Sequence, residues 1–347
     1  MRILIPDLPY AGEADIEREA LAPLLAEPGA LLEVHRLIDY SAVPLESWRR
    51  ADAVIVSSDR FRLGGETIGE LERCKVIVRG GVGFDNVDAA AASRRNIPLC
   101  NVPDYGTDEV ADHAIAMMLA LRRGLPTYGE YLSVDPVAGW RFDAPPLIRR
   151  MKVQSFAVVG LGRIGRAAAA RARAFGMRVL YYDPYVAEAV YERKDSLDAL
   201  LAEADVVSLH CPLTPDTRGM IGAPQLARMK PGSILVNTAR GQVVDLDAVA
   251  AALRAGRPGG VALDVLPQEP PDPDHELIAA WRLQPTWLAG RLLLSPHAAF
   301  YSPESVRDLR FKAAATARDA LADQGLRHCV NLQHLDLSRL QVAVKPA

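Results

Sequence analysis

Arg240, Glu269 and His297 lie in the second half of the chain and combine a planar cation, a carboxylate and an imidazole. An arginine can bind a substrate carboxylate through two parallel N–H donors. A histidine beside a carboxylate can keep its proton at neutral pH and transfer it to a carbonyl oxygen. Together the three residues predict an acid–base site for a small carboxylic acid, although each alone also fits an ordinary surface or packing role.

A glycine-rich turn, Gly160-Leu-Gly-Arg-Ile-Gly165, precedes that set. It connects a short apolar run to an Ala/Arg-rich stretch of helical character, which is the setting of a dinucleotide-binding turn. In such a turn Gly160 permits the sharp bend, Gly162 admits the diphosphate to the backbone, and Gly165 lets helix and strand pack closely. The helix N-terminus then stabilises the diphosphate charge. A packing turn without a ligand is the alternative.

Asp183 ends the next expected strand and would select the cofactor. Its carboxylate would accept hydrogen bonds from the adenosine ribose hydroxyls and repel a 2′-phosphate, which favours NAD over NADP. Arg193 and Lys194 favour the opposite choice, because a nearby cation can accommodate that phosphate. The sequence therefore predicts NAD and leaves NADP open.

Alternating strand and helix patterns run through both halves of the chain and predict two α/β units. Short β-branched runs between polar helical stretches are typical of buried parallel strands. The expected strands are 3–6, 53–57, 76–78, 156–159, 179–182, 206–209, 234–237, 261–265 and 292–294. A long helix is expected over 108–122, with Thr107 or Asp108 as its N-cap. The segment 126–146 has no clear period and is expected to form an ordered arm or linker.

The composition is that of a globular protein of about two domains. The 347 residues carry a formal net charge of −3 with both signs interspersed, so no nucleic-acid partner is expected. No apolar run reaches the ~18 residues of a membrane span, and the start has no signal-peptide pattern, which predicts a cytoplasmic protein. The four cysteines form no C-x-x-C pair. They are expected to be buried apolar residues, not metal ligands or disulfides.

The motifs follow one another as G-L-G-R-I-G, Y-Y-D-P, L-H-C-P-L-T, N-T-A-R-G, A-L-D-V, E-P and S-P-H-A-A. In this order and spacing the chain resembles the D-isomer-specific 2-hydroxyacid dehydrogenase family over essentially its whole length. The segments V-R-G-G-V-G-F-D-N-V-D, F-Y-S and C-V-N are similar to those of the branch that includes the carboxyl-terminal-binding proteins. That branch holds both dehydrogenases and NAD-dependent transcriptional corepressors.

The resemblance implies a role for each matching residue. Arg240 would bind the substrate carboxylate, His297 would be the general acid/base and Glu269 its partner. Asp264 would face the nicotinamide carboxamide. The residues on the substrate side would be Arg79, Gly81, Val82, Gly83, Arg240 and Phe300. The residues on the NAD side would be Thr107, Gly160, Gly162, Arg163, Ile164, Gly165, Asp183, His210, Cys211, Pro212, Thr217, Thr238 and Asp264. No metal is implied.

The resemblance also implies two doubly wound parallel-sheet domains. A Rossmann cofactor domain of residues 104–296 would be inserted in a flavodoxin-like substrate domain of residues 1–103 plus 297–347. Closure around the substrate would exclude water. Relatives suggest a homodimer that is joined through the cofactor domain by the 126–146 arm.

Two functions are consistent with these features. The favoured one is an NAD-dependent oxidoreductase that interconverts a small 2-oxo acid and its D-2-hydroxy acid. The alternative is an NAD-sensing dimeric scaffold, or corepressor-like binding protein, which keeps the same Arg/Glu/His set. The composition and the lack of extended disordered tails favour the enzyme. The substrate stays open among glyoxylate, hydroxypyruvate, phenylpyruvate and branched or thioether acids.

Overall fold

The chain folds into two compact units, which we call the terminal domain and the central domain. The computed structural model describes residues 1–10, 13–36, 39–143 and 145–343. The terminal domain contains Met1–Gly106 and Ser302–Ala347, and the central domain contains Thr107–Tyr301. The expected divisions lie after residues 103 and 296. The structure places them later because a helix begins at each boundary and because the backbone up to Tyr301 stays bound to the central domain, as described below.

The terminal domain is built on a parallel sheet with the strand order β2-β1-β3-β4-β5. Its strands are β1 (Arg2–Ile5), β2 (Leu31–Val34), β3 (Ala53–Val56), β4 (Val76–Arg79) and β5 (Leu99–Cys100). Its α-helices are α1 (Asp15–Leu25), α2 (Leu45–Arg50), α3 (Gly65–Gly69), α4 (Ala89–Arg94) and α12 (Pro303–Leu321). This is the strand order of flavodoxin-like sheets.

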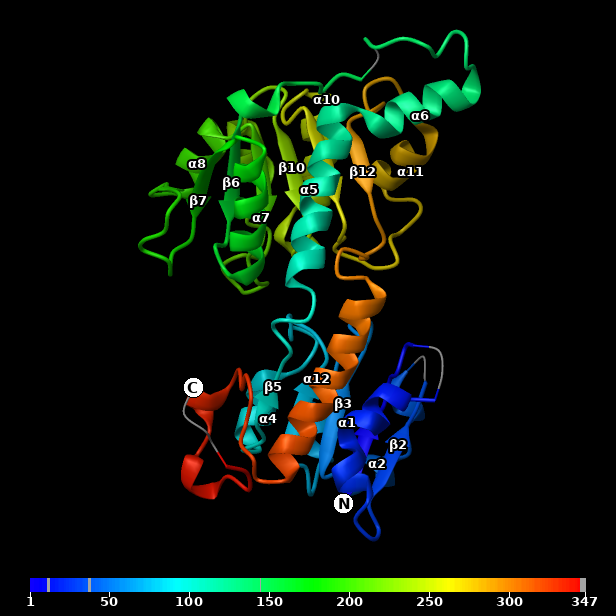
Figure 1. The fold of residues 1–347 in the computed structure, drawn as a ribbon, viewed down its shortest axis with the longest axis vertical. Helices are drawn as coiled ribbons and strands as arrows, with labels where there is room; N and C mark the ends of the chain where they lie inside the picture. Colours follow the sequence, from blue (N-terminus) through cyan, green and yellow to red (C-terminus); the bar gives the residue numbers. More distant parts are fainter. Residues whose placement is uncertain (11–12, 37–38, 144, 344–347) are drawn as a thin grey trace. The chain divides into compact units, whose positions relative to one another are not determined.

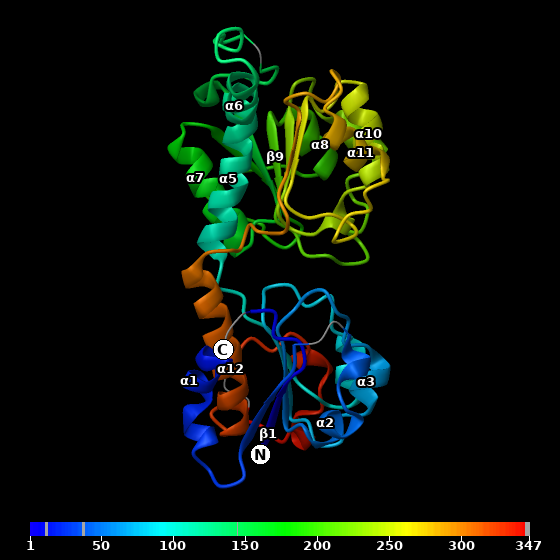
Figure 2. The ribbon, with the colours of Figure 1, turned by 90° about the vertical axis from the view of Figure 1, so that its right-hand side faces the viewer.

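Alternate residues of the strands pack under different helices. Ile3 and Ile5 share a core with apolar residues of α1 and α12. Leu4, which points to the opposite face, packs with residues of α2, α3 and α4. Figure 2 shows α1 and α12 on one side of this sheet and α2 and α3 on the other. Both faces are therefore covered, as the apolar strands require.

A segment near the C-terminus covers the outer edge of β5. The backbone N–H of Val330 donates to the Leu99 carbonyl at 2.8 Å, and the Asn331 side chain accepts from the Leu99 N–H at 2.8 Å. Asn331 is almost completely buried and also donates to the Ile97 carbonyl. Both ends of the chain thus complete one sheet.

The central domain contains a seven-stranded parallel sheet with the order β12-β11-β10-β9-β6-β7-β8. Its strands are β6 (Ser155–Val159), β7 (Arg178–Tyr182), β8 (Glu192–Arg193), β9 (Val206–Leu209), β10 (Ile234–Asn237), β11 (Gly260–Leu263) and β12 (Leu292–Leu294). The order reverses between β6 and β9, and ligands of doubly wound sheets bind at the carboxyl ends of the strands at such a point.

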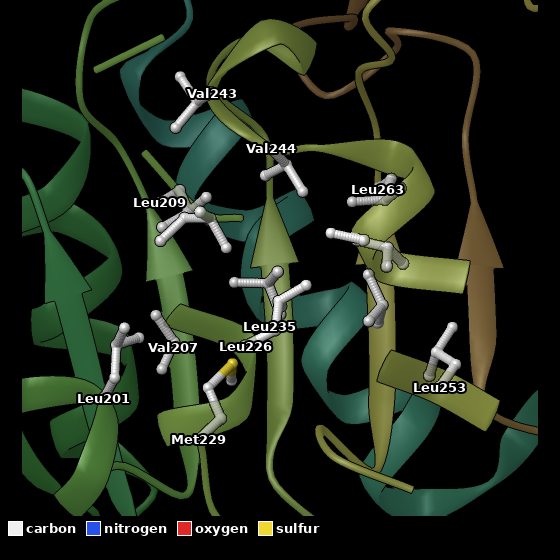
Figure 3. Packing of buried hydrophobic residues seen from close by; sticks show 14 of the residues in the cluster. Leu201, Val207, Leu209, Leu226, Met229, Leu235, Val243, Val244, Leu253 and Leu263 are labelled. Atoms are coloured by element: carbon white, nitrogen blue, oxygen red, sulfur yellow. The ribbon is translucent and has the colours of Figure 1, made fainter. Parts of the chain in front are cut away.

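Helices cover both faces of the seven-stranded sheet. They are α5 (Thr107–Arg123), α6 (Leu125–Val134), α7 (Arg163–Ala174), α8 (Leu197–Glu203), α9 (Ala223–Arg228), α10 (Leu246–Arg254) and α11 (Glu276–Leu283). α5 and α7 lie on one face, and α8, α10 and α11 lie on the other (Figures 1 and 2). Figure 3 shows the core on the face covered by α8, α10 and α11, where Val207, Leu235 and Leu263 from neighbouring strands belong to one buried cluster with helix residues such as Leu201 and Leu253.

The structure confirms the predicted fold class of two parallel-sheet α/β domains. Each of the nine expected strands corresponds to a strand of the structure, whereas β2, β5 and β8 were missed. The expected helix over 108–122 is α5. The segment 126–146, for which an ordered arm or linker without a clear period was expected, begins with the helix α6, in which Pro126 occupies the first turn. None of the helices among the described residues is long and apolar enough to cross a membrane.

Candidate functional site

The glycine-rich turn follows β6 and has the geometry that a dinucleotide turn requires. Gly160 has φ +91°, and a Cβ there would lie 2.8 Å from the backbone nitrogen of Cys211. A Cβ at Gly165 would overlap the Gly160 carbonyl oxygen. A Cβ at Gly162 would meet nothing within 4 Å. Two glycines are thus required by packing, and the third leaves open space over the backbone.

Helix α7 begins at this open position. Gly162 is its N-cap and contributes no side chain, and no acidic residue lies in the first turn, which contains Arg163 and Ile164. The first N–H groups of a helix carry a partial positive charge. The N-terminus of α7 is therefore suited to an anion such as a diphosphate.

Asp183 lies at the end of β7 and ties the glycine turn to it. Its carboxylate accepts from the backbone N–H of Leu161 at 2.8 Å, and from those of Tyr185 and Val186 at 2.8 Å and 3.2 Å. The side chain is mostly buried. Lys194, one of the two cations that favoured NADP, is paired with the carboxylates of Glu192 and Glu203.

Two residues at the carboxyl ends of neighbouring strands have buried polar atoms without a partner among the described residues. These atoms are Nδ1 of His210, after β9, and Oγ1 of Thr238, after β10. The other ring nitrogen of His210 contacts the Ser208 hydroxyl at 2.8 Å. Buried polar atoms are usually hydrogen-bonded, so a bound group with donors and acceptors would complete them. Together with the open backbone at Gly162, these atoms fit a dinucleotide.

The remaining residues expected on the NAD side also lie at the ends of elements. Cys211 is buried, and burial raises its pKa to about 11. The Thr217 hydroxyl donates to the Pro212 carbonyl at 2.7 Å and so stabilises its own loop. Thr107 is the first residue of α5. Direct contact of these residues with a cofactor stays a prediction.

The His210 ring gives a testable pH dependence. Loss of solvent around it lowers its pKa to about 4, whereas an unfolded histidine titrates near 6.5. The unfolded chain therefore binds more protons between these values, and the free energy of unfolding decreases as the pH falls through that window. We expect His210→Gln to reduce the slope of the unfolding free energy against pH, because the variant lacks this group and so takes up about one proton fewer on unfolding.

Calorimetric unfolding between pH 4.5 and 7 measures the effect. The exposed His334 on the terminal domain provides the matched control, because His334→Gln should leave the pH dependence unchanged. Equal slopes for the native protein and His210→Gln would contradict the assignment.

His297 and Glu269 form a direct pair in the central domain. Nδ1 of His297 lies 2.7 Å from Oε2 of Glu269, and the other carboxylate oxygen accepts from the Leu266 N–H at 2.8 Å. The His297 side chain is 26% exposed to solvent and the Glu269 side chain is 35% exposed, so a small molecule can reach both. His297 has φ +53°, an unusual backbone conformation for a residue with a side chain. The proposed acid–base pair is thus in contact.

The loop that carries Arg240 packs against the loop that carries Glu269. A Cβ at Gly241 would overlap the Leu266 carbonyl, and the Gln242 amide donates to the Pro267 carbonyl at 3.0 Å. The buried Asn237 side chain donates to the Arg240 carbonyl at 2.9 Å. The half-buried Arg240 therefore projects from a backbone held to the neighbouring strand end.

Asp264 holds the backbone on both sides of His297. Its Oδ1 accepts from the Ser295 hydroxyl at 2.5 Å and from the Ala298 N–H at 2.9 Å, and Oδ2 accepts from the Ala299 N–H at 3.0 Å. His113 of α5 contacts the Ser295 hydroxyl at 2.9 Å. His113 and Ser295 were not among the residues expected at the site. The expected contact of Asp264 with the nicotinamide stays a prediction beside the role seen here.

Phe300 also belongs to the central domain. Its ring meets that of His297 edge to face, with centroids 6.3 Å apart and an interplanar angle of 84°. It therefore forms an apolar wall beside the imidazole, and its expected contact with a substrate stays a prediction.

Arg79 and the Gly81–Gly83 loop lie at the carboxyl end of β4 in the terminal domain. The Arg79 side chain is buried and donates to Asn86 and to the Gly80 carbonyl. A Cβ at Gly81 would overlap the Arg79 guanidinium. Asn101 donates to the Val82 carbonyl at 2.7 Å. The loop is thus fixed against the end of β5, and Gly81 permits the close approach of the arginine.

Comparison with known proteins identifies matches across the chain. The NAD-binding domain profile of the D-isomer-specific 2-hydroxyacid dehydrogenase family matches residues 115–299. D-3-phosphoglycerate dehydrogenase of Archaeoglobus fulgidus is 34% identical over 291 residues, which cover 83% of this chain and 53% of that protein. The chain spans about half the length of the curated relatives it matches.

Solved structures match over nearly the full chain. D-lactate dehydrogenase of Aquifex aeolicus, solved with NAD and lactic acid, is 28% identical with a TM-score of 0.78, and the match covers 99% of this chain and 100% of that one. An NADPH-dependent glyoxylate/hydroxypyruvate reductase of Sinorhizobium meliloti is 26% identical with a TM-score of 0.81, and the match covers 100% and 99%. These matches do not single out the branch with the carboxyl-terminal-binding proteins.

Proposed function

Because this chain belongs to the D-isomer-specific 2-hydroxyacid dehydrogenase family, we propose that it interconverts a small 2-oxo acid and its D-2-hydroxy acid in an NAD-dependent reaction. The central domain is the NAD-binding domain of that family. The contact between His297 and Glu269 carries the proposal, because it places an acid–base pair within reach of a small molecule. A cytoplasmic location is part of the proposal.

Each residue of the catalytic set has a distinct task. NADH, when bound, supplies the hydride that a 2-oxo acid needs for reduction. Glu269 orients the imidazole through Nδ1, so that Nε2 delivers the proton to the carbonyl oxygen. In the reverse direction Nε2 removes the hydroxyl proton. The carboxylate of Glu269 stabilises the imidazolium in either case.

Arg240 binds and orients the substrate carboxylate in this proposal. Its guanidinium offers two parallel donors, which fix the plane of a carboxylate and not only its position. The carbonyl next to that carboxylate would then be held in one orientation, and the gain from such alignment is large. The backbone ties around Arg240 keep this donor pair in place.

A panel of 2-oxo acids tests the function. Purified protein with NADH should consume at least one of glyoxylate, hydroxypyruvate, phenylpyruvate, and branched or thioether acids, as measured by loss of NADH absorbance. The oxidation of 3-phosphoglycerate with NAD belongs in the panel, because several relatives carry that activity in their names. Chiral chromatography should identify the D-product. NAD binding without turnover of any substrate would instead support the scaffold.

Cofactor preference should depend on Asp183. We expect the native protein to prefer NADH, because the carboxylate at the end of β7 would repel a 2′-phosphate. Asp183→Ala should increase the kcat/KM ratio of NADPH to NADH. The substitution also removes the bond to Leu161, so the ratio is the informative quantity and not the absolute rate. Equal or better use of NADPH by the native protein would show that this assignment is wrong.

We also propose a homodimer that is joined by the 126–146 arm. Among its described residues the Tyr128 hydroxyl donates to the Phe142 carbonyl at 2.7 Å. Its large apolar side chains are nevertheless exposed, with Val137, Trp140 and Phe142 each more than 80% accessible. Neighbouring exposed apolar groups of this size mark an interaction surface.

Substitution of Trp140 and Phe142 by glutamate should therefore convert a dimer into a monomer. Light scattering coupled to size-exclusion chromatography measures the mass. Leu283 on α11 is also 82% exposed but lies outside the arm, so Leu283→Glu is the control and should leave the mass unchanged. A native monomer, or a dimer that survives both arm substitutions, would contradict the proposed interface.

A further inference from the structure

Two of the four cysteines lie opposite each other in the terminal domain. Cys100 ends β5, and Cys329 belongs to the segment that covers the edge of this strand. The two residues form an antiparallel bridge. Cys100 and Cys329 are far apart in the chain, and only the fold pairs them, so the sequence alone predicts separate buried residues.

The hydrogen bonds around the bridge define its geometry. The Asn101 N–H donates to the His328 carbonyl at 3.2 Å, and the Val330 N–H donates to the Leu99 carbonyl at 2.8 Å. Cys100 and Cys329 are thus framed by these bonds and are a non-hydrogen-bonded pair, in which the Cα atoms are about 4.5 Å apart and both side chains point to the same face. This separation is within the range of about 4.4–6.8 Å for disulfides.

The two thiols differ in environment. Cys100 is completely buried and Cys329 is partly exposed. A hydrogen bond from Cys100 lowers the pKa of Cys329, whereas that bond and burial raise the pKa of Cys100. The Cys329 sulfur also contacts the buried Asn331 side chain at 3.3 Å. Cys329 is therefore the more accessible thiol and the one that ionises more readily, and the buried Cys100 thiol lies within hydrogen-bond distance of it.

We propose that Cys100 and Cys329 are a thiol oxidation site that closes to a disulfide on reaction with a low-molecular-weight disulfide. The Cys329 thiolate attacks one sulfur of that disulfide, which breaks the S–S bond, expels one small thiolate and leaves a mixed disulfide. Cys100, as thiolate, then attacks the Cys329 sulfur and expels the second small thiol. Two protein thiols are oxidised and one small disulfide is reduced to two thiols.

The bond would link the edge of the sheet covalently to the C-terminal segment. The segment is otherwise held to β5 by backbone bonds and by the Asn331 side chain. This inference does not depend on the proposed enzymatic activity, since it uses residues outside the catalytic set.

Oxidation of the native protein with glutathione disulfide provides the test. We expect two of the four thiols to disappear in a thiol titration carried out after denaturation, and dithiothreitol to restore them. Peptide mapping without reduction should give one crosslinked pair that contains Cys100 and Cys329. Stable glutathione adducts at Cys329 without the crosslink would overturn the proposal, as would four thiols that stay unchanged or a crosslink through another cysteine.

Matched variants make the test specific. Burial raises the pKa of Cys74 to about 12 and that of Cys211 to about 11, so Cys74→Ser and Cys211→Ser should still form the crosslink. Cys329→Ser should form none, and Cys100→Ser should stop at a mixed disulfide on Cys329. Circular dichroism of each variant establishes that it is folded. A folded Cys329→Ser protein that still loses two thiols would overturn the assignment.

Discussion

Replacement of His297 by glutamine is expected to lower kcat for the best 2-oxo acid by about 10²- to 10⁴-fold, which is the usual contribution of a general acid. Glutamine is similar in size and polarity but cannot deliver a proton. NAD affinity should remain close to native, because the residues that fit the diphosphate lie at the glycine turn. Steady-state kinetics and fluorescence titration with NADH measure the two quantities separately.

Glu269→Gln provides the comparison for that result. It should reduce kcat less, because the imidazole is retained while the charge beside Nδ1 is lost. The protonated imidazole is then less stable, so the alkaline limb of kcat/KM for the 2-oxo acid should move to lower pH. An unchanged limb, measured with viscosity controls, would break the functional pairing. His334→Gln on the exposed surface should have native kinetics.

Arg240→Lys should lower kcat/KM for the 2-oxo acid by about 10- to 10²-fold although the charge is kept. A hydrogen bond to a charged group contributes about 1.5–3 kcal/mol, and a lysine ammonium cannot reproduce the two-pronged contact. NAD affinity should change little. Arg282→Lys, an exposed position on α11, is the matched control. Native kcat/KM in Arg240→Lys would show that another residue binds the carboxylate.

The buried strands of both domains could be predicted from the sequence because burial on two faces demands continuous apolar runs. β3 and β4 are buried at every position. The strands that were missed do not meet this condition. β8 has two exposed residues, β5 has only two residues, and β2 contains a glutamate at a sheet edge. Short or edge strands depend on their neighbours more than on their own composition.

The helix α6 was missed for a related reason. Only Thr127 is buried among its residues, so no apolar face repeats along it. A period arises where one side of a helix packs on a core, and α6 carries its apolar groups outward instead.

The candidate site was predictable where the geometry of a motif follows from the spacing of its own residues. Gly160, Gly162 and Gly165 have distinct steric reasons that follow from local spacing. The contacts of His113 and Ser295 with the Asp264 region could not be predicted, because they join α5 to the ends of β11 and β12. A single histidine in an amphipathic helix carries no sign of such a partner. Hydrogen bonds between distant elements become visible only in the fold.

The terminal domain, assembled from both ends of the chain, has a consequence for protein synthesis. Roughly 200 residues of the central domain leave the ribosome after the N-terminal segment of the terminal domain and before its C-terminal segment. At about 5–20 residues per second, translation of that interval takes about 10–40 s. During this time the segment Met1–Gly106 exposes the apolar surface that α12 later covers. The nascent N-terminal segment is therefore an expected chaperone client, while the continuous central domain can fold as soon as it emerges.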